Sequence, residues 1–136
     1  MTTINLNEIT DIAIYRTNAK IEIDNAAGDA RGRYITTVDG QELTYANKLT
    51  DAEQYLADGS PPDLTPYPWV EAEAEARGIP GVAAANIIKN TADGWRPIGV
   101  NIEKERIRGK DRIDTATTIA DVVSEKRTAI DILDAI

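Results

Sequence analysis

Apolar side chains, with one threonine among them, recur at helical spacing through residues 82–107. They return every three or four residues, which places them on one face of an α-helix; the positions are Ala84, Ile88, Thr91, Trp95, Ile98 and Ile102. Pro97 interrupts this stretch, with Gly94 and Gly99 close by. Because a proline inside a helix removes one backbone hydrogen bond and clashes with the preceding turn, we expect a bend or break near residues 95–97.

Three further stretches predict shorter helices. Residues 41–57 carry apolar side chains on one face, and residues 67–77 carry Pro68 in their first turn, where a helix tolerates proline. Gly78 is placed to end the second of these helices. Residues 118–136 start with a threonine cap and carry an apolar stripe that reaches the last residue.

Residues 8–35 allow two interpretations. Apolar side chains at three- and four-residue spacing predict one long helix; they are Ile12, Tyr15, Ala19, Ile23, Ala26, Ala27, Ala30 and Tyr34. Alternation of apolar and polar residues on either side of residues 17–18 instead suits a short β-hairpin before residue 25. The alanine-rich second half favours a helix throughout. Gly28 and Gly32 weaken such a helix by about 1 kcal/mol each, yet allow a neighbour to approach closely.

Residues 58–68 hold four of the six prolines and predict an extended linker. The short connection between residues 8–35 and 41–57 predicts an antiparallel helical hairpin. We therefore expect a mainly α fold, with this hairpin joined by the linker to C-terminal helices. The expected organisation is an acidic N-terminal segment, 1–57, and a C-terminal segment, 69–136, or the two packed as one domain.

Composition narrows the function classes. The 136 residues include no cysteine and no histidine, which removes disulfides, thiolate metal sites and the commonest general base and metal ligand. The net charge is −8, and residues 1–76 hold 14 acidic and 5 basic residues, which disfavours binding to nucleic acid. No apolar run approaches the roughly 20 residues that span a bilayer, and we expect no signal peptide. We expect a protein without enzymatic activity, cofactor, metal, nucleic-acid partner or membrane partner.

Two charged clusters have ordinary explanations. Glu71, Glu73 and Glu75 could bind a cation, but a solvated helix face near the favourable N-terminal dipole is the preferred interpretation. A basic run, with Arg106, Arg108 and Arg112 as its arginines, is interleaved with acidic residues at ion-pair spacing. Surface pairing is therefore favoured over docking of this run onto an acidic partner, such as the N-terminal half of a neighbouring subunit.

The remaining candidates for interaction are aromatic or aliphatic. Tyr67 and Trp69 flank a proline and either anchor the linker on the core, the favoured interpretation, or form an aromatic surface. Trp95 fits a core position better than a binding hot spot. The C-terminal stripe includes Ile130, Leu133 and Ile136. Because it continues to the end of the chain, we expect it to pack against another surface, which would place it at a subunit interface.

The order of these features carries a resemblance. The sequence RGRYITT at residues 31–37 precedes GQELTY, KL and AEQYLA, and after the proline-rich spacer come YPWVEAEA, a helix with Trp95, and IEKERIRGK at residues 102–110. From about residue 20 onward the chain resembles small proteins encoded in the tail region of tailed bacteriophages, near tail-fibre and tail-fibre-assembly genes. It departs from them at Pro97, where alanine is expected.

The resemblance implies a virion structural protein, made in the host cytoplasm and associated with the tail or tail fibre. Its partners would be other tail or fibre proteins and further copies of itself in a homo-oligomer. One alternative is a tail-fibre assembly chaperone that is absent from the finished particle. Another, from the acidic N-terminal half, is an inhibitor of a host defence protein that mimics DNA. Apolar stripes on long helices agree with self-association.

Overall fold

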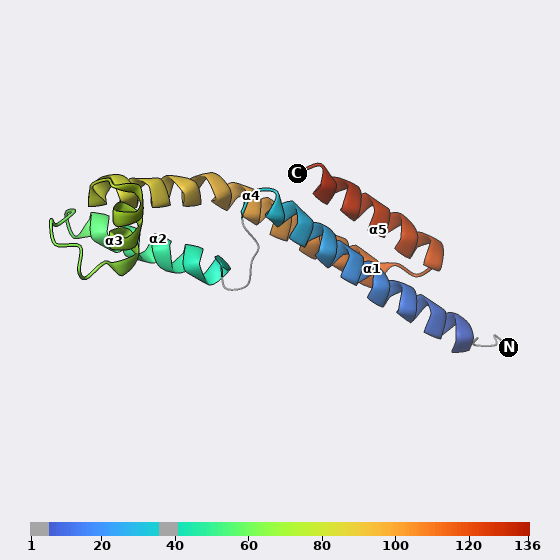
Figure 1. Ribbon diagram of the computed structural model, residues 1–136. Coiled ribbons are helices and arrows are strands. Elements are labelled where there is room, and N and C mark those ends of the chain that lie inside the picture. Colours follow the sequence, from blue (N-terminus) through green and yellow to red (C-terminus); the bar gives the residue numbers. More distant parts are fainter. Residues whose placement is uncertain (1–5, 36–40) are drawn as a thin grey trace. The chain divides into compact units, whose positions relative to one another are not determined.

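The computed structural model describes residues 6–35 and 41–136, with the side chains of the first helix from residue 11 onward. Within these residues it contains five helices and no strand (Figure 1). They are α1 (Leu6–Gly32), α2 (Gln41–Ala57), α3 (Pro68–Arg77), α4 (Gly81–Thr115) and α5 (Ile119–Asp134). The mainly α fold is therefore confirmed. A β-hairpin before residue 25 is contradicted, because α1 runs through this stretch as a continuous helix.

The chain divides into two compact units at positions that differ from the boundary expected at residues 58–68. Unit 1 consists of residues 1–35 and 98–136, and unit 2 consists of residues 36–97. The proline-rich loop thus lies inside unit 2, between α2 and α3. Each unit has its own buried side chains and is described by itself.

Helix α4 contributes to both units and is unbroken at Pro97. It extends as one helix over 35 residues, so, of the bend or break expected near residues 95–97, the break is absent. A single proline removes one hydrogen bond from the helix, and the remaining bonds of so long a helix preserve it on both sides. Pro97 is nevertheless the last residue of unit 2. The proline marks the boundary between units rather than an end of the helix.

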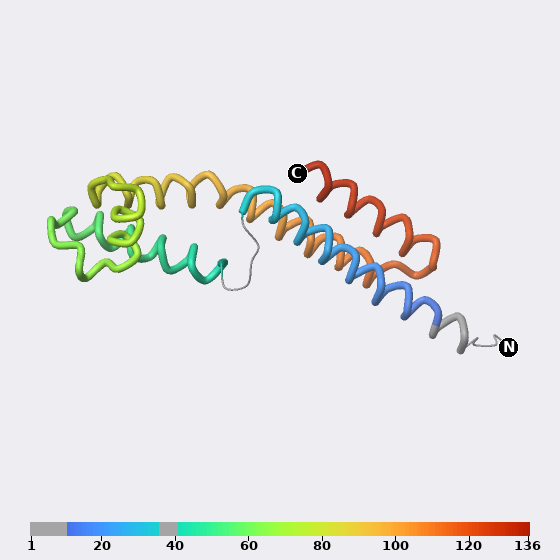
Figure 2. Tube along the Cα trace, in the orientation of Figure 1, coloured from blue at the N-terminus to red at the C-terminus, as the bar shows by residue number. Residues whose placement is uncertain are grey.

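Unit 1 is built from α1, the second part of α4 and α5. Its buried apolar side chains are small or aliphatic; they include Ala19, Ile23, Ala26, Ala27 and Ala30 of α1, Ile102 and Ile113 of α4, and Val122, Ala129 and Leu133 of α5. Alanines allow helix axes to approach closely, so α1 packs directly on α5. The two run in the same direction (Figure 2), with Glu22 near Lys126 and Arg33 near Leu133.

The antiparallel pairing expected between the first two helices is not confirmed. α1 belongs to unit 1 and packs on α5, whereas α2 belongs to unit 2 and packs on α3. Chain proximity suggested the expected pair, but the alanine face of α1 is matched by the aliphatic face of α5, about a hundred residues later in the chain.

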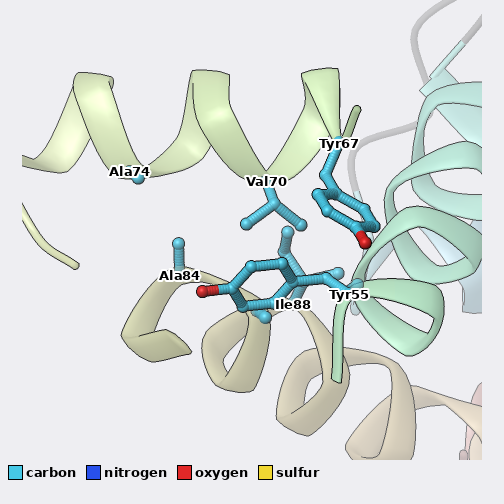
Figure 3. Close-up of a cluster of buried hydrophobic side chains, with 8 residues drawn as sticks. Tyr55, Tyr67, Val70, Ala74, Ala84 and Ile88 are labelled. Carbon is cyan, nitrogen blue, oxygen red and sulfur yellow. The ribbon is translucent and has the colours of Figure 1, made fainter. Parts of the chain in front are cut away.

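Unit 2 has an aromatic and aliphatic core (Figure 3). Its buried residues come from α2, α3, the loop between them and the start of α4; they are Ala52, Tyr55, Tyr67, Val70, Ala74, Ala84, Ala85 and Ile88. The rings of Tyr55 and Tyr67 meet edge to face, with centroids 5.1 Å apart. Gly78, with a φ of 64°, ends α3 as the sequence predicts, because a left-handed residue there favours glycine.

Candidate interaction surface

Arg106 is engaged inside unit 1 rather than presented to a partner. Its guanidinium donates to Glu103 on the same helix at 2.8 Å and to Asp24 of α1 at 2.9 Å. Lys110 binds the same Asp24 carboxylate at 2.9 Å, and Arg31 of α1 reaches Glu103 at 2.9 Å. These contacts form a row of ion pairs along the side of α1 that faces α4.

The pKa values in this row follow from the pairing. Hydrogen bonds from Arg106 chiefly lower the pKa of Glu103. Burial raises the pKa of Asp24, but hydrogen bonds from Lys110 and Arg106, together with their charges, outweigh burial and hold it below its ordinary value. Glu103 and Asp24 in turn raise the pKa of Arg106. Each shift has a structural partner, so the row holds helices together.

The other two arginines of the basic run do not join Arg106 in one surface. Arg108 donates to Glu105 at 3.0 Å, and Glu105 is buried, with 7% of its surface exposed. Arg112 is exposed near the end of α4. Arg106 and Arg108 are therefore paired within the chain, which is the interpretation favoured from the sequence.

The aromatic candidates of unit 2 have different environments. Tyr67 is buried, and its hydroxyl donates to Asp58 at 2.5 Å, which raises the pKa of Tyr67 to about 12. It anchors the loop on the core, as favoured. Trp69 is exposed, and the backbone N–H groups of Trp69 and Val70 both donate to Asp51 of α2. Trp95 lies partly buried on α4.

Several acidic side chains of unit 2 also have partners within the unit. Asp51 and Asp58 accept the hydrogen bonds described above, and Glu73 binds Lys48 at 2.6 Å and Arg77 at 2.7 Å. The hydrogen bond from Lys48 is the main cause of the lowered pKa of Glu73. These carboxylates therefore stabilise the packing of α2, α3 and the loop between them. Across residues 6–35 and 41–136, no group of three or more acidic side chains is arranged to hold a metal ion.

The C-terminal stripe packs within its own chain. Leu133 is fully buried in unit 1, and Ile130 and Ile136 are partly buried. Arg33 donates to the Leu133 carbonyl at 2.8 Å, and the Tyr34 hydroxyl donates to the carbonyl of Ile136. The surface that we expected to cover this stripe is α1 of the same chain, so Leu133 is not available to a second subunit.

Helix α1 has a second face that is exposed and uncharged. Its residues follow one another at spacings of four, three, four, three and four; they are Ile14, Asn18, Ile21, Asn25, Gly28 and Gly32, and all are exposed. The solvent-exposed fractions of Ile14 and Ile21 are 52% and 53%. This set, here called the outer face of α1, lies opposite the buried alanines on the helix.

A groove of about 420 Å³ borders the outer face on the side of α5. Its lining combines an aromatic ring, aliphatic side chains and one ion pair; the residues are Tyr15, Asn18, Ala19, Ile21, Glu22 and Lys126. Lys126 of α5 binds Glu22 at 2.8 Å. The arrangement offers shape and apolar area, the features of a packing surface, rather than converging acids, bases or nucleophiles.

Sequence reasoning found the inner face of α1 but missed the outer one. The signal was present: six consecutive positions at alternating four- and three-residue steps carry no charge, which is unusual on an exposed helix. It was obscured because asparagine and glycine are not apolar residues.

None of the helices in the described part of the chain has the length and apolar character needed to cross a membrane.

Comparisons with protein-family models, with curated proteins and with solved structures find no match to this chain.

Proposed function

We propose that this chain is a non-enzymatic structural protein of a bacteriophage virion, associated with the tail or tail fibre, and that it acts by packing its helices against other subunits. The observation that carries the proposal is the outer face of α1. A surface helix normally has one apolar stripe and an opposite polar face. α1 packs an alanine-rich face on α5 and still exposes two isoleucines on the other side.

The distribution of hydrophobicity around the helices supports this proposal. Among the helices of the described residues, α1 separates apolar from polar side chains least, and α5 separates them most. The weak separation in α1 reflects apolar side chains on two of its sides, the buried alanines and the exposed isoleucines. The resemblance to tail-region proteins supplies the setting, in which small helical subunits assemble into larger particles.

Light scattering on the purified protein tests the packing function. We expect a multimer whose mass persists on dilution and changes little between low and high salt, because apolar packing is not screened by ions. Mass spectrometry of purified virions from the encoding phage tests the location, and the chain is expected among the tail proteins. A chain absent from every purified virion contradicts the structural role.

The groove beside α1 favours one alternative, a tail-fibre assembly chaperone. A groove of about 420 Å³ that combines Tyr15, Ala19 and Ile21 with Asn18 and the Glu22–Lys126 ion pair suits a segment of a client protein. A chaperone would bind its client during assembly and leave the finished particle. Capture of a fibre protein from infected cells, together with absence from purified virions, would favour the chaperone over the virion subunit.

A further inference from the structure

From the outer face of α1 we infer that a second copy of this chain packs on it, parallel and in register, so that the same residues of the two copies meet. The inference rests on the proposed function and adds to it the identity of the partner, the direction of the helices and the contact residues. It follows from the spacing of the face, its charged borders and the groove beside it.

The spacing of the outer face matches that of a coiled-coil seam. Alternating steps of four and three residues average 3.5 residues, the repeat that keeps two helices in contact along their length. From Ile14 to Gly32 the face is about 27 Å long, at about 1.5 Å per residue. In a parallel pair each isoleucine would pack on its equivalent, and Asn18 and Asn25 would each meet their own copies. An asparagine pair in such a seam specifies register at a cost in stability.

Gly28 and Gly32 extend the face at the C-terminal end of α1. A Cβ added at Gly28 would meet nothing within 4 Å, so no contact inside the chain requires glycine there. An exposed glycine costs a helix about 1 kcal/mol relative to alanine. A close approach by a second helix explains two small residues one turn apart on this face.

The charges beside the outer face differ on its two sides. On the α4 side Asp24 and Arg31 are bound to Arg106, Lys110 and Glu103, a set with one positive charge in excess. On the α5 side, Glu22 is bound to Lys126, Asp29 follows seven residues later, and Asp11 and Arg33 lie at the two ends of this side, which leaves one negative charge in excess.

These borders distinguish a parallel pair from an antiparallel one. In a two-fold antiparallel pair each border meets its own copy, which brings like charges together. In a parallel arrangement the α4 side of one copy meets the α5 side of the next, which brings opposite charges together. The groove on the α5 side, lined by Tyr15 and Ile21, then receives side chains from the α4 side of the neighbour.

A charge placed in the face tests the contact. Ile21→Glu is expected to raise the concentration at which the oligomer dissociates by about tenfold or more, because each copy would place an unpaired carboxylate in the seam. Ile107→Glu is the matched control, since Ile107 is 55% exposed on α4 and Ile21 is 53% exposed on α1. The control is expected to leave the mass unchanged. Circular dichroism of both variants verifies that the helices remain folded.

Cysteine cross-linking tests the direction. The chain contains no cysteine, so single-cysteine variants give an unambiguous result. Asn18→Cys and Gly28→Cys lie about 15 Å apart along α1, at about 1.5 Å per residue. A parallel pair in register brings both positions to their own copies, and each variant is expected to form a disulfide-linked dimer under mild oxidation. Ile107→Cys is the control that stays monomeric in denaturing gels.

Other results overturn the inference. A multimer whose mass is unchanged by Ile21→Glu places the contact elsewhere and leaves the proposed packing function standing. Cross-linking at only one of the two cysteine positions, or at neither, contradicts a parallel pair in register. A wild-type protein that stays monomeric at every concentration excludes the second copy as partner, and the presence of the chain in virions then decides the proposed function separately.

Discussion

Gly109 shows how one residue sets the distance between helices in unit 1. A Cβ at this position would lie 2.7 Å from the Cβ of Ala129 on α5 and 3.3 Å from the Cδ1 of Ile23 on α1. The Cβ of an alanine cannot move away without its backbone. The absence of a side chain at Gly109 therefore permits α4, α5 and α1 to pack as closely as they do.

We expect Gly109→Ala to destabilise the protein by about 1–3 kcal/mol, because the overlap with Ala129 exceeds the gain in helix propensity. Gly94→Ala, in the same helix, is the control. A Cβ there meets nothing within 4 Å, so this variant is expected to gain up to about 1 kcal/mol. Urea unfolding followed by circular dichroism measures both. Equal stabilisation by the two substitutions would contradict the close approach.

Asp51 of α2 caps the first turn of α3. The N-cap position, Tyr67, makes no side-chain cap, and the Asp51 carboxylate of α2 instead accepts from the backbone N–H groups of Trp69 and Val70. A side chain from another helix thus satisfies donors that the helix itself leaves unpaired.

Asp51→Ala is expected to lower the free energy of unfolding of unit 2 by about 0.5–2 kcal/mol, the usual cost of losing a cap. Amide hydrogen exchange at Trp69 and Val70 is expected to speed up with it. Asp51→Asn keeps an acceptor oxygen and should lose less. Glu53→Ala, at an exposed position of the same helix, controls for the removal of a carboxylate. Unchanged exchange at both amides would show that the cap contributes nothing.

At the scale of the helices, ion pairs along α1 and α4 bind elements that are far apart in the sequence. Asp24 accepts from two basic side chains of α4, and Glu103 of α4 binds Arg31 of α1. The lowered pKa values of Asp24 and Glu103 mean that the folded state favours their ionised forms. The sign of the pH dependence follows from this.

A carboxyl group whose pKa is lower in the folded state stabilises the fold above its ordinary value, 3.8 for Asp24 and 4.5 for Glu103. That stability is lost as the pH falls through the folded pKa. We therefore expect the urea midpoint to decline below about pH 4, and to decline less steeply in Asp24→Asn. Asp111→Asn, on the exposed side of α4, is the control for removing one negative charge. Identical profiles for all three proteins would contradict the assignment.

At the scale of the whole molecule, the chain carries two separate sets of buried side chains. Leu133 is fully buried in unit 1, and Val70 is fully buried in unit 2. The buried residues of unit 2 lie between Ala52 and Ile88, and α4 contributes residues to both units. Local stability follows the burial and hydrogen bonding of each region.

We expect Leu133→Ala, at a cost of about 2–5 kcal/mol, to speed amide exchange mainly in α1, α5 and the second part of α4. Val70→Ala is expected to act mainly on α2, α3 and the first part of α4. Hydrogen exchange read helix by helix measures both. Equal acceleration across all helices in either variant would show that the chain opens as one cooperative block.

Local patterns were sufficient to find the helices. The three- and four-residue periodicity placed α2 at residues 41–57, where the structure has it, and located α3 and α5 to within a few residues. Thr118 caps α5 by accepting from the N–H of Asp121, and Gly78 ends α3. These features depend on neighbours within one helical turn, and the sequence displays such neighbours directly.

The expectations that the structure does not confirm depend on distant neighbours. The pairing of α1 with α2 and the external role of Leu133 both assumed partners that the chain supplies elsewhere, since α1 packs on α5. The break at Pro97 assumed that one missing hydrogen bond outweighs the rest of a 35-residue helix. A short stretch of sequence does not indicate which helix, about a hundred residues away, will pack on a given face of α1.

The sequence by itself determined that this protein is mainly helical, located the helices near residues 41–57, 67–77 and 118–136, and gave residues 8–35 an alanine-rich face, because helical periodicity and capping are local properties. Only the tertiary structure decided that α5 covers this face and that Ile14 and Ile21 remain exposed on the opposite side. α1 carries apolar residues on both sides, so periodicity alone could not choose the inner one. The choice was made by which face fitted the aliphatic side chains of α5 and the ion pairs of α4.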